Sequence, residues 1–405
     1  MAASTKRNVE IIDNRIKKLS VEELIDYLVD FDAVGFSGTI FEAREAVDVS
    51  RILRKEGILT IYGGPNATVN WDLYTGFFDI IFKGEGEKDF DRILDCAETG
   101  TFTKEFFEVN GTYINSKNFR IKDLDALPFP KRELVNINDY RRIEKDYLSG
   151  VEPVDTVVSS RGCPFDCSFC SSSVIWERRA TFRSPANVVS EIKYLIENYG
   201  TKGIYFREDN FTTSRKRLLE FSDAIKPLEI KWICESRVDT LDKEILEKMK
   251  DAGCLGIWFG IESVSNDTLK KINKGITIEQ AEKTVGLCRE IGIKTGGSFI
   301  IGLPHENRED ILKTIKGARS IGLDKVFFNR FFAIPKSKLY MEVKKKSLDR
   351  YEFENIIIPD TEYLHADEVT DLFWENAVSI KKRLLASLVT PRGAEIIDRI
   401  LRNFL

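Results

Sequence analysis

Residues 161–170 read Arg161-Gly-Cys163-Pro-Phe-Asp-Cys167-Ser-Phe-Cys170 and hold three of the seven cysteines in this chain. Cysteine thiolates ligate iron–sulfur clusters, and such clusters usually take four of them. Because this tight loop supplies only three, a cubane bound to it would keep one iron open, just as a catalytic metal site keeps a position free for substrate. The spacing C-x3-C-x2-C therefore predicts an iron–sulfur site with an open position.

A zinc site and a disulfide framework suit the triplet less well. A structural zinc site needs a fourth protein ligand, but the only histidines, His305 and His365, lie far away in the sequence and no C-x2-C partner motif occurs. A disulfide framework requires a denser cysteine pattern than seven in 405 residues. The remaining cysteines have no paired spacing, so we expect no second cluster and a buried structural thiol at each: Cys96, Cys234, Cys254 and Cys288.

The length and composition indicate a protein of two or three domains with large buried cores, since 42% of its 405 residues are hydrophobic. A net charge of −4 gives no polyanion-binding footprint, so nucleic acid is not an expected partner. No apolar run approaches the roughly 18 residues of a membrane span. We expect no signal peptide, because residues 1–7 lead into no apolar h-region. Reduced cysteines and a low-potential cluster favour a cytoplasmic location.

Residues 1–100 alternate short apolar runs with helical patterns. The runs lie at 9–12, 33–36, 58–62 and 79–82, and the helical patterns at 21–29, 42–55 and 88–97. Such alternation predicts an α/β fold with a parallel, doubly wound, Rossmann-like sheet. Small residues follow three of the runs, at the strand ends where such sheets bind ligands: Ser37-Gly-Thr39, Gly63-Gly-Pro65 and Gly84-Glu-Gly-Glu87. Residues 101–150 are predicted to form a linker with one hairpin, because Asn110-Gly111 lies between apolar flanks.

A second α/β series begins near residue 151. Strand-like runs occur at 155–159, 203–207, 231–234, 255–260, 294–301 and 325–332, with helices expected at 185–199, 213–224, 241–252, 277–291 and 307–321. Six strands with helical crossovers favour a partial (β/α)6 barrel over residues 151–345, and the cysteine loop follows its first strand, where such folds place their chemistry. Residues 346–405 are expected to be mainly helical, apart from 356–359, and to cover the barrel.

The second region resembles a known superfamily. The triplet with its preceding aromatic, the stretch Trp232-Ile-Cys-Glu-Ser-Arg237-Val-Asp239, residues 246–275 and Gly297-Ser-Phe-Ile-Ile-Gly302-Leu-Pro304 are similar to the radical S-adenosylmethionine (radical SAM) superfamily, in its cobalamin-dependent class B methylase-like subgroup. The resemblance implies a [4Fe-4S] cluster whose open iron is chelated by SAM. It also implies a flavodoxin- or ferredoxin-type reductant, whose electron cleaves SAM to methionine and a 5′-deoxyadenosyl radical.

The resemblance also assigns residues by position. Cys163, Cys167 and Cys170 would hold the cluster, with the backbone at Phe169 facing the adenine. SAM contacts are expected at Glu208, Asp209, Asn210, Ser236, Arg237, Glu262 and Gly302. A carboxylate suits the methionine amine and the Arg237 fork suits a carboxylate, whereas ion pairing or helix capping is the alternative for each polar residue. Two positions depart from the pattern: Ala333-Ile-Pro335-Lys336-Ser337 replaces a Pro-Gly-Thr turn, and His305 replaces a glycine. An exposed loop histidine is expected there, with a cavity-facing acid or base as the alternative.

The first region is similar to the cobalamin-binding domain found upstream of such barrels. Ser37, Thr39, Gly63, Gly64 and Thr68 would then pack round the nucleotide tail of the cofactor. The first strand, its loop and its helix are missing, however, and no histidine precedes residue 305 to ligate cobalt. Two alternatives stay open: a shortened domain that binds cobalamin without a histidine ligand, or a remnant that supports the barrel, with its cleft filled by Phe36, Tyr62 and Trp71.

The leading hypothesis is therefore a radical SAM enzyme that carries out cobalamin-dependent C-methylation of a small molecule or peptide. A cobalamin-free radical SAM enzyme would instead catalyse rearrangement, elimination, decarboxylation or ring formation. The alternative from another class is a non-enzymatic iron–sulfur electron-transfer or sensor protein.

Overall fold

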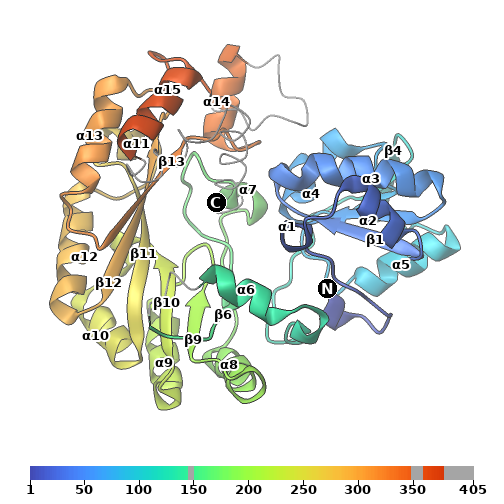
Figure 1. The fold of residues 1–405 in the computed structure, drawn as a ribbon, viewed down its shortest axis with the longest axis horizontal. Coiled ribbons are helices and arrows are strands. Elements are labelled where there is room, and N and C mark those ends of the chain that lie inside the picture. The colour runs from blue at the N-terminus through green and yellow to red at the C-terminus, as the bar shows by residue number, and fades with distance from the viewer. Residues whose placement is uncertain (145–149, 348–358, 378–405) are drawn as a thin grey trace. The chain divides into compact units, whose positions relative to one another are not determined.

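The structure is a computed structural model that describes residues 1–144, 150–347 and 359–377. The chain forms two compact units (Figure 1). The first comprises Met1–Gly203 with Ile334–Ile357, and the second comprises Ile204–Ala333 with Ile358–Leu405. The domain boundaries expected at residues 100, 150 and 345 remain predictions.

The first unit contains a five-stranded sheet in the order β1-β2-β3-β5-β4. Its strands are β1 (Ala33–Ser37), β2 (Leu59–Gly63), β3 (Ile80–Ile81), β4 (Phe106–Val109) and β5 (Thr112–Asn115). All neighbours are parallel except the β4–β5 hairpin. The helices of this part are α1 (Asn14–Lys17), α2 (Val21–Leu28), α3 (Ala43–Lys55), α4 (Gly64–Asn70) and α5 (Phe90–Thr99). The predicted α/β fold with a parallel sheet is confirmed.

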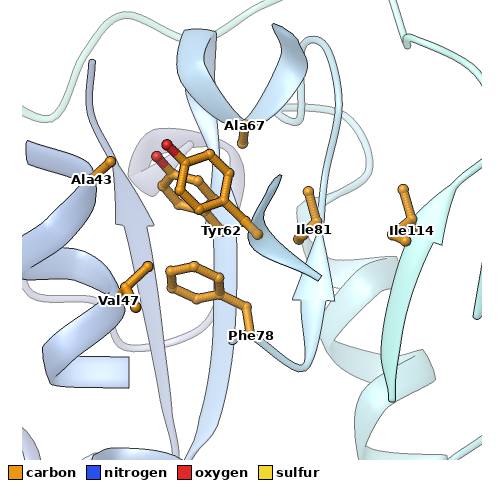
Figure 2. Packing of buried hydrophobic residues seen from close by; sticks show 8 residues of the cluster. Ala43, Val47, Tyr62, Ala67, Phe78, Ile81 and Ile114 are labelled. Carbon is orange, nitrogen blue, oxygen red and sulfur yellow. The ribbon is translucent and has the colours of Figure 1, made fainter. Parts of the chain in front are cut away.

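Aromatic packing fills the space between this sheet and two of its helices (Figure 2). The rings of Tyr62 and Phe78 stack with centroids 4.6 Å apart. Val47 of α3 and Ala67 of α4 belong to the same buried cluster. Burial of large apolar side chains on one sheet face is what holds α3 and α4 against the strands.

One sequence expectation for this region needs correction. Residues 9–12 form no strand, and Asp13 instead caps α1 through a hydrogen bond from the Arg15 amide. Glu10 and Ile11 are exposed while Ile12 packs on the core, so this run has too little to bury as a strand. The predicted hairpin is present, with Asn110 and Gly111 both at positive φ (51° and 72°). Its strand β5 pairs with β3 and so extends the sheet.

A six-stranded sheet follows, in the order β13-β12-β11-β10-β9-β6. Its strands are β6 (Val154–Val157), β9 (Gly203–Phe206), β10 (Lys231–Ser236), β11 (Cys254–Glu262), β12 (Lys294–Ile301) and β13 (Lys325–Arg330). The pairings from β10 to β13 are parallel. All six predicted strands are thus present, whereas closure into a partial barrel stays a prediction. A separate antiparallel pair, β7 (Ser160–Arg161) with β8 (Thr181–Phe182), brackets the cysteine loop.

The five predicted helices of this region also form, and Figure 1 shows helices along one side of the strands. Their bounds are α8 (Pro185–Tyr199), α9 (Arg215–Ile225), α10 (Lys243–Asp251), α12 (Ile278–Ile291) and α13 (Arg308–Ala318). Shorter helices are α6 (Ile137–Glu144), α7 (Ser172–Ile175), α11 (Asn266–Lys271), α14 (Lys338–Ser347) and α15 (Ala366–Leu372). Of the C-terminal region expected to be helical, residues 348–358 and 378–405 lie outside the described residues. Within the described ranges, no helix has the length and apolar character needed to cross a bilayer.

Candidate active site

The cysteine loop leaves β7 through a turn that only glycine can make. Gly162 has φ +87°, and a Cβ there would lie 2.2 Å from the Arg179 carbonyl oxygen. Cys163, Cys167 and Cys170 follow, none of them in a disulfide, with Cys167 buried. The loop ends at α7, where the Ser172 amide donates to the Cys170 sulfur at 3.4 Å. The three thiols therefore lie on one short loop with a fixed entry and exit.

Two buried serine hydroxyls at the end of this loop have no hydrogen-bond acceptor among the described residues. Ser168 and Ser172 are each 6% exposed, and within the described part of the chain their Oγ atoms have no hydrogen-bond partner. Buried hydroxyls without partners are costly, so their presence beside three cysteines fits a bound group that carries acceptor atoms. Among the described residues no three Cys, His, Asp or Glu side chains converge on one metal ion. A cubane does not require that, because each thiolate binds a different iron.

The start of the cysteine loop is held by the loop that follows β3. Arg161, two residues before Cys163, pairs with Glu85 and, at 2.8 Å, with Glu87. Glu85 is 7% exposed and also accepts a hydrogen bond from the Ile121 amide at 2.7 Å. Burial lowers the pKa of Arg161, but the charges of Glu87 and Glu85 outweigh this and raise it overall. The Gly84-Glu-Gly-Glu87 segment therefore fixes the cysteine loop instead of lying open to solvent.

Arg120 provides a second hold on the same loop. Its guanidinium donates to the carbonyl oxygens of Trp176 and Arg179, the latter at 3.1 Å, and to the Thr181 hydroxyl at 3.1 Å. Trp176 and Arg179 are the residues that enclose Gly162. The turn around the cysteine loop is thus tied to the chain segment that leaves the first sheet.

In the second unit, the segment after β9 contains one well-placed candidate. Asn210 is 1% exposed, and within the described residues its Nδ2 has no hydrogen-bond partner. Its Oδ1 accepts from Thr212, whose hydroxyl is also 2.5 Å from the Ser236 Oγ. Glu208 is buried, whereas Asp209 is exposed. The unpaired amide of Asn210 fits a ligand with acceptor atoms. The contact of Asn210 with SAM stays a prediction.

Arg237 is already engaged by protein groups. Its Nε and Nη2 both lie 2.9 Å from the Asp239 carboxylate, and Nη2 donates to the Lys274 carbonyl at 2.7 Å. The sequence predicted that the guanidinium of Arg237 binds the carboxylate of SAM, but its Nε and Nη2 bind Asp239. The SAM contact of Arg237 stays a prediction. Glu262, at φ 75°, forms a buried ion pair with Lys274 at 2.9 Å.

The turn after β12 is closed by a buried carboxyl group. Glu306 is fully buried, and its Oε2 accepts from the amides of Gly302 (2.9 Å) and Leu303 (3.0 Å). Burial raises its pKa to about 7 against these two hydrogen bonds. His305 is half-buried and its Nε2 has no partner among the described residues. The expectation of an exposed loop histidine is therefore wrong, and burial lowers the pKa of this imidazole.

Sequence reasoning missed several residues around these positions: Glu85, Tyr205, Glu235, Asp239, Lys274 and Glu306. Glu235 is an example, because its carboxylate accepts from the Tyr205 hydroxyl at 2.6 Å and burial raises its pKa. Of these residues, only Glu306 could have been found from the local sequence, because it lies four positions after Gly302. The four cysteines outside the triplet are buried as predicted. Burial raises the pKa of the Cys234 thiol, and the thiol of Cys254 raises it further.

The cobalamin candidates gather in part at one edge of the first sheet. Ser37 pairs with Gly63 across β1 and β2, and a Cβ at Gly64 (φ +86°) would lie 2.5 Å from the Ser37 Oγ. Thr68 is buried, and its hydroxyl donates to the Gly64 carbonyl and accepts from the Gly84 amide. Thr39 is exposed and caps the turn at Ile40–Glu42. Ser37, Gly63 and Gly64 thus share the carboxyl edge, while Thr68 serves the protein's own backbone.

Comparison with known proteins agrees with this chemistry. A sequence profile described as the Radical SAM superfamily matches residues 157–318. An uncharacterized methyltransferase of Pyrococcus horikoshii is 33% identical over 83% of this chain and 74% of its own length. An anaerobic magnesium-protoporphyrin IX monomethyl ester cyclase of Rubrivivax gelatinosus is 28% identical over 87% of this chain and 65% of its own length.

The fold has a counterpart among solved structures. The radical S-adenosylmethionine methyltransferase TsrM from Kitasatospora setae, solved with cobalamin and a [4Fe-4S] cluster bound, has a TM-score of 0.69 and 16% identity, with 91% of this chain and 79% of that chain covered. The protein is thus an enzyme whose fold and cysteine loop suit a [4Fe-4S] cluster and S-adenosylmethionine. The chain belongs to the radical SAM superfamily.

Proposed function

We propose that this protein is a cobalamin-dependent radical SAM methylase that transfers a methyl group to a carbon of a small molecule or peptide. In this proposal residues 1–100 form a shortened cobalamin-binding Rossmann-like domain and residues 101–150 a linker with a hairpin. Residues 151–345 form a partial (β/α)6 barrel, which residues 346–405 cover. The [4Fe-4S] cluster supplies the electron that cleaves SAM to methionine and a 5′-deoxyadenosyl radical.

One observation carries the proposal: the carboxyl edge of the first sheet and the cysteine loop belong to the same compact unit. The small residues Ser37 and Gly64 meet at that edge, and the next loop along it pairs with Arg161 beside Cys163. Ligands of parallel α/β sheets bind at the carboxyl ends of the strands. A cofactor bound there lies on the side of the domain to which the cysteine loop is tied.

The chain's own residues take defined roles in this proposal. Cys163, Cys167 and Cys170 bind the cluster, and the unpaired hydroxyls of Ser168 and Ser172 donate to it or to its ligand. Asn210 offers its unpaired amide to SAM. The backbone at Phe169 remains assigned to the adenine of SAM. The other residues assigned to SAM are Glu208, Asp209, Ser236, Arg237, Glu262 and Gly302, of which Arg237 also binds Asp239 and the Lys274 carbonyl.

A specific observation favours a second candidate, a cobalamin-free radical SAM enzyme. Tyr62 is buried in the core with Ala67 of α4, and Phe36 and Trp71 pack on the same cluster. This is the filling expected if the domain is a remnant. The relative in Rubrivivax gelatinosus is named as a cyclase, so ring formation is the first such reaction to consider. Membership of an enzyme superfamily sets the non-enzymatic alternative aside.

Two measurements on the reconstituted protein separate these candidates. Chromatography after strong reduction with SAM should yield 5′-deoxyadenosine, and a variant with all three cluster cysteines changed to Ala should yield none. Equilibrium dialysis with hydroxocobalamin, accompanied by corrinoid absorption bands, should show binding tighter than that of an unrelated protein. Deoxyadenosine formation without cobalamin binding would overturn the methylase proposal and leave the cobalamin-free candidate.

A further inference from the structure

One ammonium group of the first unit has no acidic partner among the described residues. Lys83 lies two residues after the end of β3, and its side chain is buried, with the residue 7% exposed. Its Nζ lies 5.0 Å from the centroid of Trp71 and 5.5 Å from that of Phe107, whose rings meet edge to face. Within the described ranges no carboxylate pairs with Lys83. Cation–π contacts recover part of the lost hydration, but a buried ammonium normally has an anionic partner as well.

A second lysine is attached to the same group of residues. Lys336 pairs with Asp72 at 2.8 Å, and Asp72 is the chain neighbour of Trp71. Burial lowers the pKa of Lys83, and the nearby positive charge of Lys336 lowers it further. Two lysines with one carboxylate leave an uncompensated positive charge. A bound anion would compensate this charge.

Lys336 is held in place at the cost of backbone strain. It has φ 62°, a conformation that favours glycine. Two residues further on, Lys338 pairs with Asp166 of the cysteine loop, and the Leu339 amide donates to the Ser168 carbonyl at 2.9 Å. The segment that carries Lys336 is therefore fixed to the cysteine loop. The lysine pair lies between the carboxyl end of β3 and a segment bound to that loop.

We infer that Lys83 and Lys336 form a binding subsite for an anionic group, a carboxylate or a phosphate, of a molecule that binds beside the cysteine loop. Such a group accepts hydrogen bonds from both ammonium ions and compensates their positive charge. The inference rests on the proposed function, since it gives the bound substrate or cofactor an anionic group at this position. The phosphate of the cobalamin nucleotide and an acidic group of the substrate share this chemistry.

Calorimetric titration of the reconstituted protein with inorganic phosphate tests the subsite. Lys83→Met keeps the aliphatic stem over the two rings and removes only the charge, and Lys336→Met does the same for its partner. Each should weaken phosphate binding about tenfold or more, the effect of one lost charged hydrogen bond. Lys83→Arg should retain binding, and Lys88→Met, at an exposed lysine, should leave it unchanged. Equal phosphate binding by wild type and Lys83→Met, or none by wild type, would overturn the inference.

The source of the anion is distinguished by two corrinoids. If the cofactor's phosphate occupies the subsite, Lys83→Met should weaken hydroxocobalamin binding and leave binding of cobinamide, which lacks the nucleotide phosphate, unchanged. If a substrate group occupies it, both corrinoids should bind wild type and variant equally while inorganic phosphate still discriminates. Deoxyadenosine formation is measured on the same samples. Its loss in wild type would reject the proposed function, whereas loss of phosphate discrimination alone would reject only the subsite.

Discussion

Changing Glu85 to Gln should loosen the cysteine loop from the first sheet. The variant keeps an oxygen that can accept from the Ile121 amide but removes the charge that faces Arg161. Arg161 retains Glu87 at 2.8 Å. The change therefore removes one of the two carboxylate partners of Arg161, which lies immediately before Gly162 and Cys163.

The expected loss of unfolding free energy follows from the burial of Glu85 and Arg161. The side chains of Glu85 and Arg161 are 7% and 25% exposed, so their interaction is screened little by solvent. Removing one partner of a buried ion pair costs about 3–5 kcal/mol, and the remaining Glu87 should reduce this to about 2–3 kcal/mol. An exposed pair provides the contrast, since Glu98, which pairs with Arg7, has a 59% exposed side chain. Glu98→Gln should leave the free energy of unfolding nearly unchanged, because solvent screens this exposed pair.

Urea unfolding of both variants, together with iron content after reconstitution, measures these effects. Glu85→Gln should be destabilised by the larger amount and should bind less iron per chain, because the loop that presents the cysteines is no longer anchored. Glu98→Gln should match wild type in both. Equal stability and equal iron content in the two variants would refute the idea that this ion pair positions the loop.

Three further outcomes are expected. Replacing any cluster cysteine by Ala, for example Cys163→Ala, should abolish iron binding and SAM cleavage together, whereas Cys96→Ala should retain both by iron assay and chromatography. Because burial raises the pKa of Glu306 to about 7 from an ordinary 4.5, the native state holds this proton more tightly than the unfolded state, and stability is lost as the pH rises between those values. Glu306→Gln removes that loss, so the variant should gain on wild type by at most about 3 kcal/mol between pH 4.5 and 7 in urea titrations. Gly64→Ala should cost about 1–3 kcal/mol of unfolding free energy by forcing a left-handed residue against Ser37, while Gly35→Ala, with no atom within 4 Å, should be nearly neutral.

Local pattern determined much of this protein. The triplet of cysteines, the alternation of strands and helices and the Asn110-Gly111 turn depend on spacing within a few residues, and a sequence displays such spacing directly. Local pattern gave a wrong prediction at residues 9–12, which include apolar side chains but pair with no strand of the described part of the chain. The helix α4 (Gly64–Asn70) went unrecognised, although Pro65 stands near its start.

Only the tertiary structure decided which charged side chains from distant parts of the chain form ion pairs. Glu85 and Arg161 are 76 residues apart in the chain, and Lys336 is 264 residues from Asp72. Neither pairing follows from periodicity, because each depends on where loops from different strands come together. The half-buried position of His305 and the raised pKa of Glu306 have the same origin. Desolvation depends on what the rest of the chain places over a group, and the sequence around that group does not contain this information.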